Sequence, residues 1–141
     1  QLTYHRLGHG EAVAIGIALD TTYSYLAGFL PEDDWRRTIS LLPALGLSVY
    51  VPELGRHVDA DDHPSNVLRG LDEFREHLGG SLTILMLRSI GAPFDVHEIR
   101  RDVMIRSIGV LRDFEHAHVL REERHEPKVL SEPPEPQGTG R

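Results

Sequence analysis

The segment from His9 to Phe29 constrains the fold most, because its central part is almost wholly apolar. Its length and its alanine content favour a helix over a strand. A helix that is apolar on nearly every side is expected to lie inside a larger body. Ala12 and Gly16 are four residues apart, so we expect a neighbouring element to approach the helix backbone closely there.

A second helix is predicted to begin at Pro31, because proline suits the first helical position and three carboxylates follow it. Gly46 is its expected end. The polar stretch over residues 51–62 is interpreted as a loop. Pro64 then opens a third helix, which ends at the Gly79–Gly80 pair.

Two short strands and a last helix are predicted after this pair of glycines. Ser81–Leu87 is rich in β-formers and large apolar residues, which favours a buried strand, and Phe94–Val96 indicates a second one. A helix from about Glu98 is expected to carry on one side Met104, Ile108 and Leu111. The expected fold class is therefore mostly α with a short β-hairpin or strand pair.

Composition excludes several classes of protein. The net charge of −7 argues against nucleic acid as the main partner, because phosphate binding needs a basic face. No apolar run approaches the length of a membrane span, and the N-terminus does not resemble a signal peptide. We therefore expect a cytoplasmic protein, with one domain over residues 1–118 and a disordered Glu-, Pro- and Arg-rich tail over 119–141.

His9 is the candidate metal ligand of this chain. Neutral imidazole is the commonest nitrogen ligand for zinc, and a side chain anchored at a helix end has a fixed direction. Gly10 beside it leaves the approach uncluttered. A histidine at a helix start is more often a surface or capping residue, so the spacing alone leaves both interpretations open.

The run HGEAVAIGIALDTTYSYLAG, which starts at His9, resembles the HGEAVAxGM segment of 3-dehydroquinate synthases and related sugar-phosphate cyclases. A second block, GLDEFREHLGGSLTILMLRSIG, lies where those enzymes have a helix, a lysine-bearing turn, a glycine and a strand. With VHEI after it, this block is most similar to a divergent branch close to sedoheptulose 7-phosphate cyclase-like enzymes. The resemblance covers Leu2 to Phe114 and implies a dehydroquinate synthase-like C-terminal helical domain.

The resemblance implies a lyase that uses NAD and a metal ion. In the family, the histidine of the HGE motif is one of three zinc ligands, so His9 is expected to bind Zn²⁺ or Co²⁺. The other two ligands and the NAD-binding domain precede this motif and are absent from the chain, so we expect it to be an inactive fragment by itself. The family reaction eliminates phosphate from a seven-carbon sugar phosphate and closes the ring by aldol addition. The implied partners are that substrate, the missing N-terminal NAD-binding domain and a second copy in a homodimer.

Arg75 is the candidate substrate-binding residue. The shikimate-type relatives have an Asp-Lys-Lys stretch before the glycine, and a lysine there contacts the substrate, whereas this chain has Phe74–Gly80. Arg75 supplies a positive donor at that place, but its planar fork differs from the point charge of a lysine. The alternative is a solvated charge on a helix face. No residue is assigned to catalysis or to NAD binding.

The remaining histidines have simpler explanations. His57 and His63 flank aspartates in a polar loop, where such groups are usually solvated. His97 is interpreted as a capping or packing residue. Positive charge near a helix C-terminus accounts for His116, His118 and His125.

Three alternative functions are weighed. A zinc polyol dehydrogenase similar to glycerol dehydrogenase shares the architecture, but it continues as helices where this chain has the Gly79–Gly80 turn and the Leu82–Leu87 strand. A zinc deaminase that begins at His9-x-Glu11 needs cysteine ligands, and the chain has no cysteine. A non-catalytic helical module would bind a partner through an exposed apolar patch.

Overall fold

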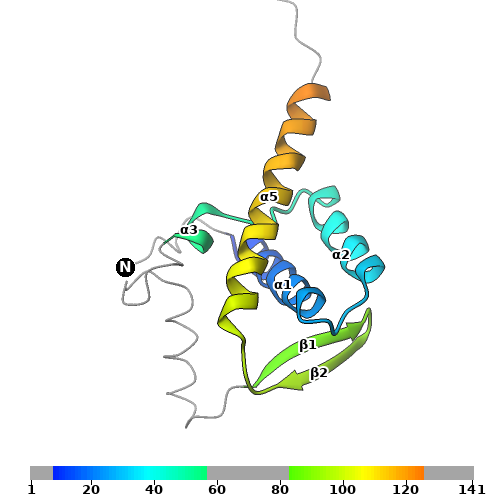
Figure 1. The fold of residues 1–141 in the computed structure, drawn as a ribbon. Helices are drawn as coiled ribbons and strands as arrows, with labels where there is room; N and C mark the ends of the chain where they lie inside the picture. The colour runs from blue at the N-terminus through cyan, green and yellow to red at the C-terminus, as the bar shows by residue number, and fades with distance from the viewer. Residues whose placement is uncertain (1–7, 57–82, 126–141) are drawn as a thin grey trace, which may run out of the picture.

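A computed structural model of the chain describes residues 8–56 and 83–125. In chain order they form α1 (His9–Leu26), α2 (Glu32–Ala44), α3 (Pro52–Gly55), β1 (Ile84–Ser89), β2 (Ala92–Val96) and α5 (Arg101–His125). Helix α1 contacts α5, α2 and β1, and the two strands form a hairpin below these helices (Figure 1). The expected fold class is confirmed. The predicted helix that starts at Pro64 lies outside the described residues.

Two clusters of buried side chains share α1. The cluster between α1, α2 and α5 consists of Ala14, Ala18, Ile39, Leu42, Val49 and Leu111. The cluster between α1, the hairpin and α5 consists of Tyr23, Met86, Val103, Met104 and Ile108. Leu19 and Tyr50 pack against both clusters. Each buried aliphatic side chain contributes about 1.5–3 kcal/mol to the stability of the fold. Because both clusters include residues of α1, the described structure is packed around this helix.

Helix α1 is nevertheless not buried on every side, which corrects the expectation from its apolar sequence. Its buried residues begin at Ala14, and the side chains of Val13 and Ile17 are 46% and 44% exposed. Among residues 8–56 and 83–125, nothing lies within 4 Å of a Cβ atom built on Gly16, so no described backbone makes the expected close approach there.

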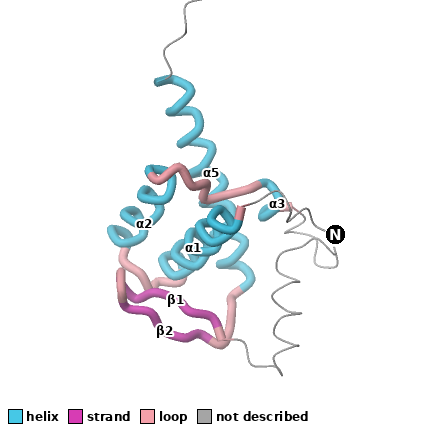
Figure 2. Tube along the Cα trace, turned by 180° about the vertical axis from the view of Figure 1, so that it is seen from behind, coloured by secondary structure: helices cyan, strands magenta, loops and turns pink. Residues whose placement is uncertain are grey.

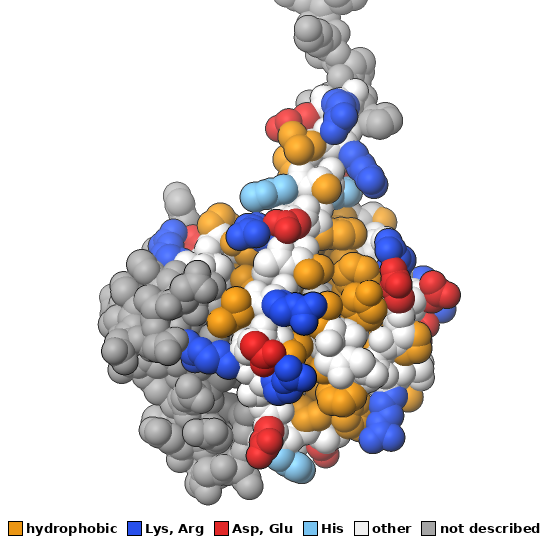
Figure 3. Space-filling model, viewed as in Figure 1, with side chains coloured by type: hydrophobic (Ala, Val, Ile, Leu, Met, Phe, Trp, Pro, Cys, Tyr) orange, Lys and Arg blue, Asp and Glu red, His pale blue; other side chains and the backbone are white. Residues whose placement is uncertain are grey.

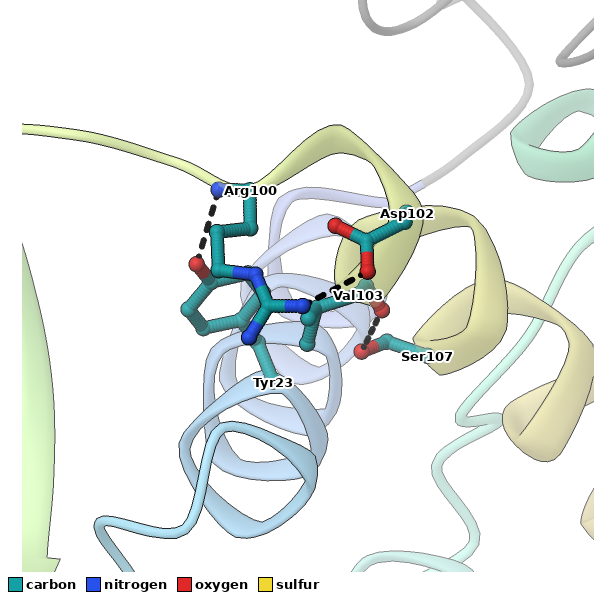
Figure 4. A network of polar contacts seen from close by, with 5 residues as sticks. All are labelled: Tyr23, Arg100, Asp102, Val103 and Ser107. Atoms are coloured by element: carbon teal, nitrogen blue, oxygen red, sulfur yellow. Dashed lines mark hydrogen bonds and ion pairs between the residues drawn. The ribbon is translucent and has the colours of Figure 1, made fainter.

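Buried polar groups connect the C-terminal half of α1 to three other elements. Trp35 Nε1 of α2 donates a hydrogen bond of 3.0 Å to Thr22 Oγ1. The Leu87 amide of β1 donates to Ser24 Oγ at 3.2 Å. The Arg100 amide, next to the start of α5, donates to the hydroxyl oxygen of Tyr23 at 2.9 Å (Figure 4).

The residues that begin and end α2 are largely those expected from the sequence. Three carboxylates occupy its first turn, Pro31 is the residue before the helix rather than its first residue, and Gly46 ends the turn after it with φ +76°. The expected loop over 51–62 needs correction at residues 52–55, because α3 forms a single turn there with Pro52 at its start and Glu53 in the first turn. Those two residues are the same helix-start signals that were recognised at α2. Residues 57–62 lie outside the described residues.

The hairpin is half-buried rather than buried. Met86 pairs with Phe94 and is fully buried, whereas Leu85 on the opposite side of β1 is 58% exposed. An antiparallel pair that packs on one side only has this alternation. Gly91 turns the chain between the strands with φ +83°. The expectation that β1 is a buried strand is therefore wrong.

Helix α5 buries the expected stripe of Met104, Ile108 and Leu111 and then extends beyond the rest of the described structure (Figure 1). It ends at His125, so the expected start of a disordered tail at residue 119 is wrong for residues 119–125. Good helix formers, and a contact of 3.3 Å between His118 Nε2 and Glu122 Oε1 one turn apart, stabilise this part as a helix. Residues 126–141 lie outside the described residues. No helix within 8–56 or 83–125 is long and apolar enough to cross a membrane.

Gly55 at the end of α3 is packed against an aromatic side chain, which makes a direct test of this packing available. A Cβ atom at Gly55 would lie 2.6 Å from the Tyr50 hydroxyl oxygen and 3.6 Å from the ring carbon that carries it. Gly55→Ala is therefore expected to destabilise the chain by about 1–3 kcal/mol in urea unfolding. Tyr50→Phe removes the clashing oxygen, so the double variant should regain most of that loss. Additive effects of the two substitutions would contradict this packing.

Candidate functional site

His9 is the first residue of α1, and its side chain is exposed. Gly8 precedes the helix in an extended conformation, with φ −60° and ψ 151°, and its carbonyl accepts the Ala12 amide at 3.1 Å. A Cβ atom at Gly10 would meet nothing within 4 Å, so the space beside the histidine is open as the sequence indicates. The imidazole therefore projects from a helix end that no described element covers.

Glu11 closes the first turn of this helix. Its carboxylate oxygen Oε2 accepts a hydrogen bond of 3.1 Å from the backbone amide of Gly8. This bond satisfies an amide that would otherwise lack an intrahelical partner, which is half of a capping box. This role was not predicted from the sequence, because Gly8 has no side chain and the three-residue spacing to Glu11 matches only the glutamate half of a capping box.

One face of α1 stays uncovered by the described elements. Four exposed residues lie on one side of the helix: His9, Val13, Gly16 and Ile17. The last three follow His9 by four, seven and eight positions, which is the spacing of one helix face. We call these four residues the open face of α1. Figure 2, seen from behind, shows α1 in front of α5. The open face therefore combines one imidazole with an apolar surface.

Asp20 lies on the same side of α1, at the end of the open face. It is half-buried, and four residues further along the helix Ser24 is fully buried. Burial raises the pKa of the Asp20 carboxyl from its ordinary 3.8 to about 6. The sequence analysis did not single out this residue, although it is the one charged side chain within the apolar run from Ala12 to Ala27.

A second polar group lies at the start of α5, on the buried side of α1. The Arg100 guanidinium donates a hydrogen bond of 2.8 Å to Asp102, and this contact lowers the pKa of the Asp102 carboxyl (Figure 4). The Arg100 amide bonds Tyr23, so the same residue attaches α1 to the first turn of α5. Its contacts are those of a helix junction, and both charged side chains are exposed.

The view along α5 shows a surface of mixed charge. Acidic and basic side chains alternate over this helix, with hydrophobic side chains between them (Figure 3). Exposed apolar side chains of α2 and α5 include Leu41, Leu45, Val119 and Leu120.

The metal-ligand hypothesis for His9 is compatible with the chemistry of the site. An exposed imidazole at a helix end is a suitable nitrogen donor for zinc. The part of the chain that the structure describes contains no group of three or more metal-ligating side chains, and a catalytic zinc site normally has three protein ligands. The described residues can therefore supply one ligand of such a site.

The other candidates are either not described or lie on other elements. Arg75, His57 and His63 lie outside the described residues. His97 follows β2 with its Nδ1 atom 3.5 Å from Thr83 Oγ1, a contact between the two ends of the hairpin. His118 pairs with Glu122 on α5.

The sequence of this chain is similar to those of several known enzymes. The family model of the 3-dehydroquinate synthase C-terminal domain matches residues 1–65. The 3-dehydroquinate synthase of Cereibacter sphaeroides is 32% identical over 102 residues, which are 72% of this chain and 26% of that protein. The 2-epi-5-epi-valiolone synthase of Streptomyces glaucescens is 44% identical over 48 residues, which are 34% of this chain and 12% of that protein.

A solved structure has the same fold. It is ValA, the 2-epi-5-epi-valiolone synthase of Streptomyces hygroscopicus subsp. jinggangensis 5008, with NAD⁺ and Zn²⁺ bound. The TM-score is 0.66 at 23% identity, and the match covers 79% of this chain and 29% of ValA. The chain therefore resembles the C-terminal domain of the 3-dehydroquinate synthase-like sugar-phosphate cyclases in sequence, and the described residues have its fold. It spans about a quarter of the length of the Cereibacter relative.

The buried carboxyl of Asp20 predicts a specific dependence of stability on pH. Its pKa is raised to about 6 in the folded chain, so between about pH 4 and pH 6 the folded state holds a proton that the unfolded state has lost. The contribution of Asp20 to stability is therefore greatest below this window and falls as the pH rises through it. Asp20→Asn should remove this fall and increase stability near pH 7, measured as urea midpoints across the window.

The control for this prediction is Asp95→Asn, the same chemical change at an exposed position of β2. It should leave the slope of stability against pH as it is in the unmodified chain. If the stability of Asp20→Asn changed with pH as steeply as that of the unmodified chain, the burial of the Asp20 carboxyl would be contradicted.

Proposed function

We propose that this chain supplies the metal- and substrate-facing C-terminal part of an NAD- and zinc-dependent sugar-phosphate cyclase. The reaction is that of a carbon–oxygen lyase, with phosphate elimination and intramolecular aldol cyclisation of a seven-carbon sugar phosphate. The observation that carries the proposal is the exposed imidazole of His9, at the end of a helix whose adjoining apolar face is uncovered. The bound NAD⁺ and Zn²⁺ of ValA support it as a property of a protein with the same fold.

His9 supplies one ligand for Zn²⁺ or Co²⁺ in this proposal, and residues outside the chain supply the others. The metal, when bound, provides a Lewis acid that polarises the substrate hydroxyl to be oxidised. The helix that carries the imidazole is anchored at its C-terminal half, which is bonded to α2, β1 and the residue before α5. Arg75 provides a positive donor for the phosphorylated substrate.

The partner of the open face is a preceding NAD-binding domain. Val13 and Ile17 are about half-exposed, and both flank the side of α1 that carries His9. Contact with a second domain would bury this apolar surface and exclude water from a cleft with the imidazole at its edge. The proposal includes a cytoplasmic location, which was expected from the sequence, and a homodimer, which the family resemblance implies.

The hairpin favours the cyclase over the polyol dehydrogenase alternative. Such dehydrogenases continue as helices, whereas this chain forms β1 and β2 and packs Met86 of β1 into a core cluster. The reaction of the full-length protein discriminates between the two classes. A cyclase releases inorganic phosphate from the sugar phosphate without net change in NAD⁺, whereas a dehydrogenase produces NADH from a polyol.

His9→Ala in the full-length protein is expected to lose zinc and turnover while the fold is retained, because a three-ligand site loses one of its ligands. Bound zinc is measured by elemental analysis after dialysis, turnover by phosphate release, and the fold by circular dichroism. His116→Ala, an exposed histidine on α5, is the matched control and should keep both zinc and activity. Full activity of His9→Ala would refute the assignment.

The non-catalytic alternative is tested by light scattering on the isolated chain. An uncovered apolar face should make the chain associate, and Val13→Ser with Ile17→Ser should reduce that association. Association that is unchanged in the double variant would show that the open face is not the surface responsible.

A further inference from the structure

We infer that Glu11 is a positioning residue for His9, and that it acts through the backbone of Gly8 rather than by contact with the metal. The inference rests on the proposed function, because it assumes that His9 is a metal ligand. The observation behind it is the hydrogen bond of 3.1 Å from the Gly8 amide to Glu11 Oε2, which spans the residue that bears the imidazole.

The first turn of α1 lacks the packing that holds the rest of the helix. Residues 8–13 are all exposed, and the buried residues of α1 begin at Ala14. The anchoring contacts to α2, β1 and α5 all involve residues 22–24, at the other end of the helix. The direction of His9 therefore depends on local hydrogen bonds of its own turn.

Within the described residues, two hydrogen bonds hold that turn at Gly8. The Gly8 carbonyl accepts the Ala12 amide, which is the ordinary helical bond, and the Gly8 amide donates to Glu11. Glycine has the largest backbone freedom of any residue and no side chain with which to cap the helix. The Glu11 carboxylate therefore restricts the backbone of the residue directly before His9.

This restriction matters to a metal site because a ligand side chain without a fixed orientation binds the metal more weakly. Residues that orient a metal ligand typically change metal affinity by about 10–100-fold when they are removed. Glu11 acts on the backbone and not on the imidazole ring, so we expect an effect at the lower end of that range.

The test measures the zinc dissociation constant of the full-length protein in competition with a chromogenic chelator. Glu11→Ala should weaken zinc binding about tenfold. Glu11→Gln keeps an oxygen acceptor at the same place and should restore most of the affinity, because glutamine also serves in capping boxes. Glu32→Ala removes a glutamate from the first turn of α2 and should leave the affinity unchanged.

Thermal unfolding of the same variants separates positioning from loss of fold. The melting temperatures of Glu11→Ala and Glu32→Ala should be similar, since both glutamates are exposed. A Glu11→Ala variant with unchanged zinc affinity overturns the inference, and so does an equal loss in Glu11→Gln, which would indicate an effect of charge.

His9→Ala, measured in the same assay, distinguishes this inference from the proposed function. Lost zinc binding in His9→Ala together with full binding in Glu11→Ala overturns the role of Glu11 and leaves His9 as a ligand. Zinc binding that survives in His9→Ala overturns the proposed function, and the role of Glu11 falls with it.

Discussion

Three hydrogen bonds from one turn of α1 connect the described elements of this domain. Thr22, Tyr23 and Ser24 are each almost fully buried, and their hydroxyl groups bond Trp35 of α2, the Arg100 amide and the Leu87 amide of β1. A buried hydroxyl without a partner would cost about 1–3 kcal/mol, so the positions of α2, α5 and the hairpin are coupled to this turn. Both core clusters are then built against α1.

This anchoring divides α1 into two parts with different roles. The C-terminal half is surrounded, and its polar groups find partners inside the protein. The N-terminal half is exposed on one side, so the imidazole of His9 and the apolar side chains of Val13 and Ile17 face outward together. A rigid helix with one open end suits a residue that must meet groups from another domain, because the direction of the side chain is set before that domain arrives. Asp20 lies where the two parts meet, which is why burial raises the pKa of its carboxyl.

Much of the fold follows from local sequence signals. The apolar run predicts α1, the carboxylates after Pro31 and the glycine at 46 bound α2, and the stripe of three apolar residues on α5 is buried as expected. The HGE motif identifies His9 as the candidate metal ligand and carries the resemblance to the cyclase family. The errors also have physical causes. One turn of α3 is too short for periodicity to detect, and Leu85 shows that a strand of large apolar residues can be covered on one side only. The helix formers after residue 118 continue α5 where their polar composition suggested disorder.

The sequence by itself determined where α1, α2, the hairpin and most of α5 lie and which residue could bind a metal, because caps, turn residues and hydrophobic spacing act within a few positions of one another. Only the tertiary structure decided which side of α1 stays open, that Asp20 is partly buried and that the first turn is held by Glu11 rather than by packing. An apolar helix has the same sequence whether one neighbour covers it or several do. The exposure of its side chains depends on how many other elements pack against the helix. Those elements come from parts of the chain that are far away in sequence.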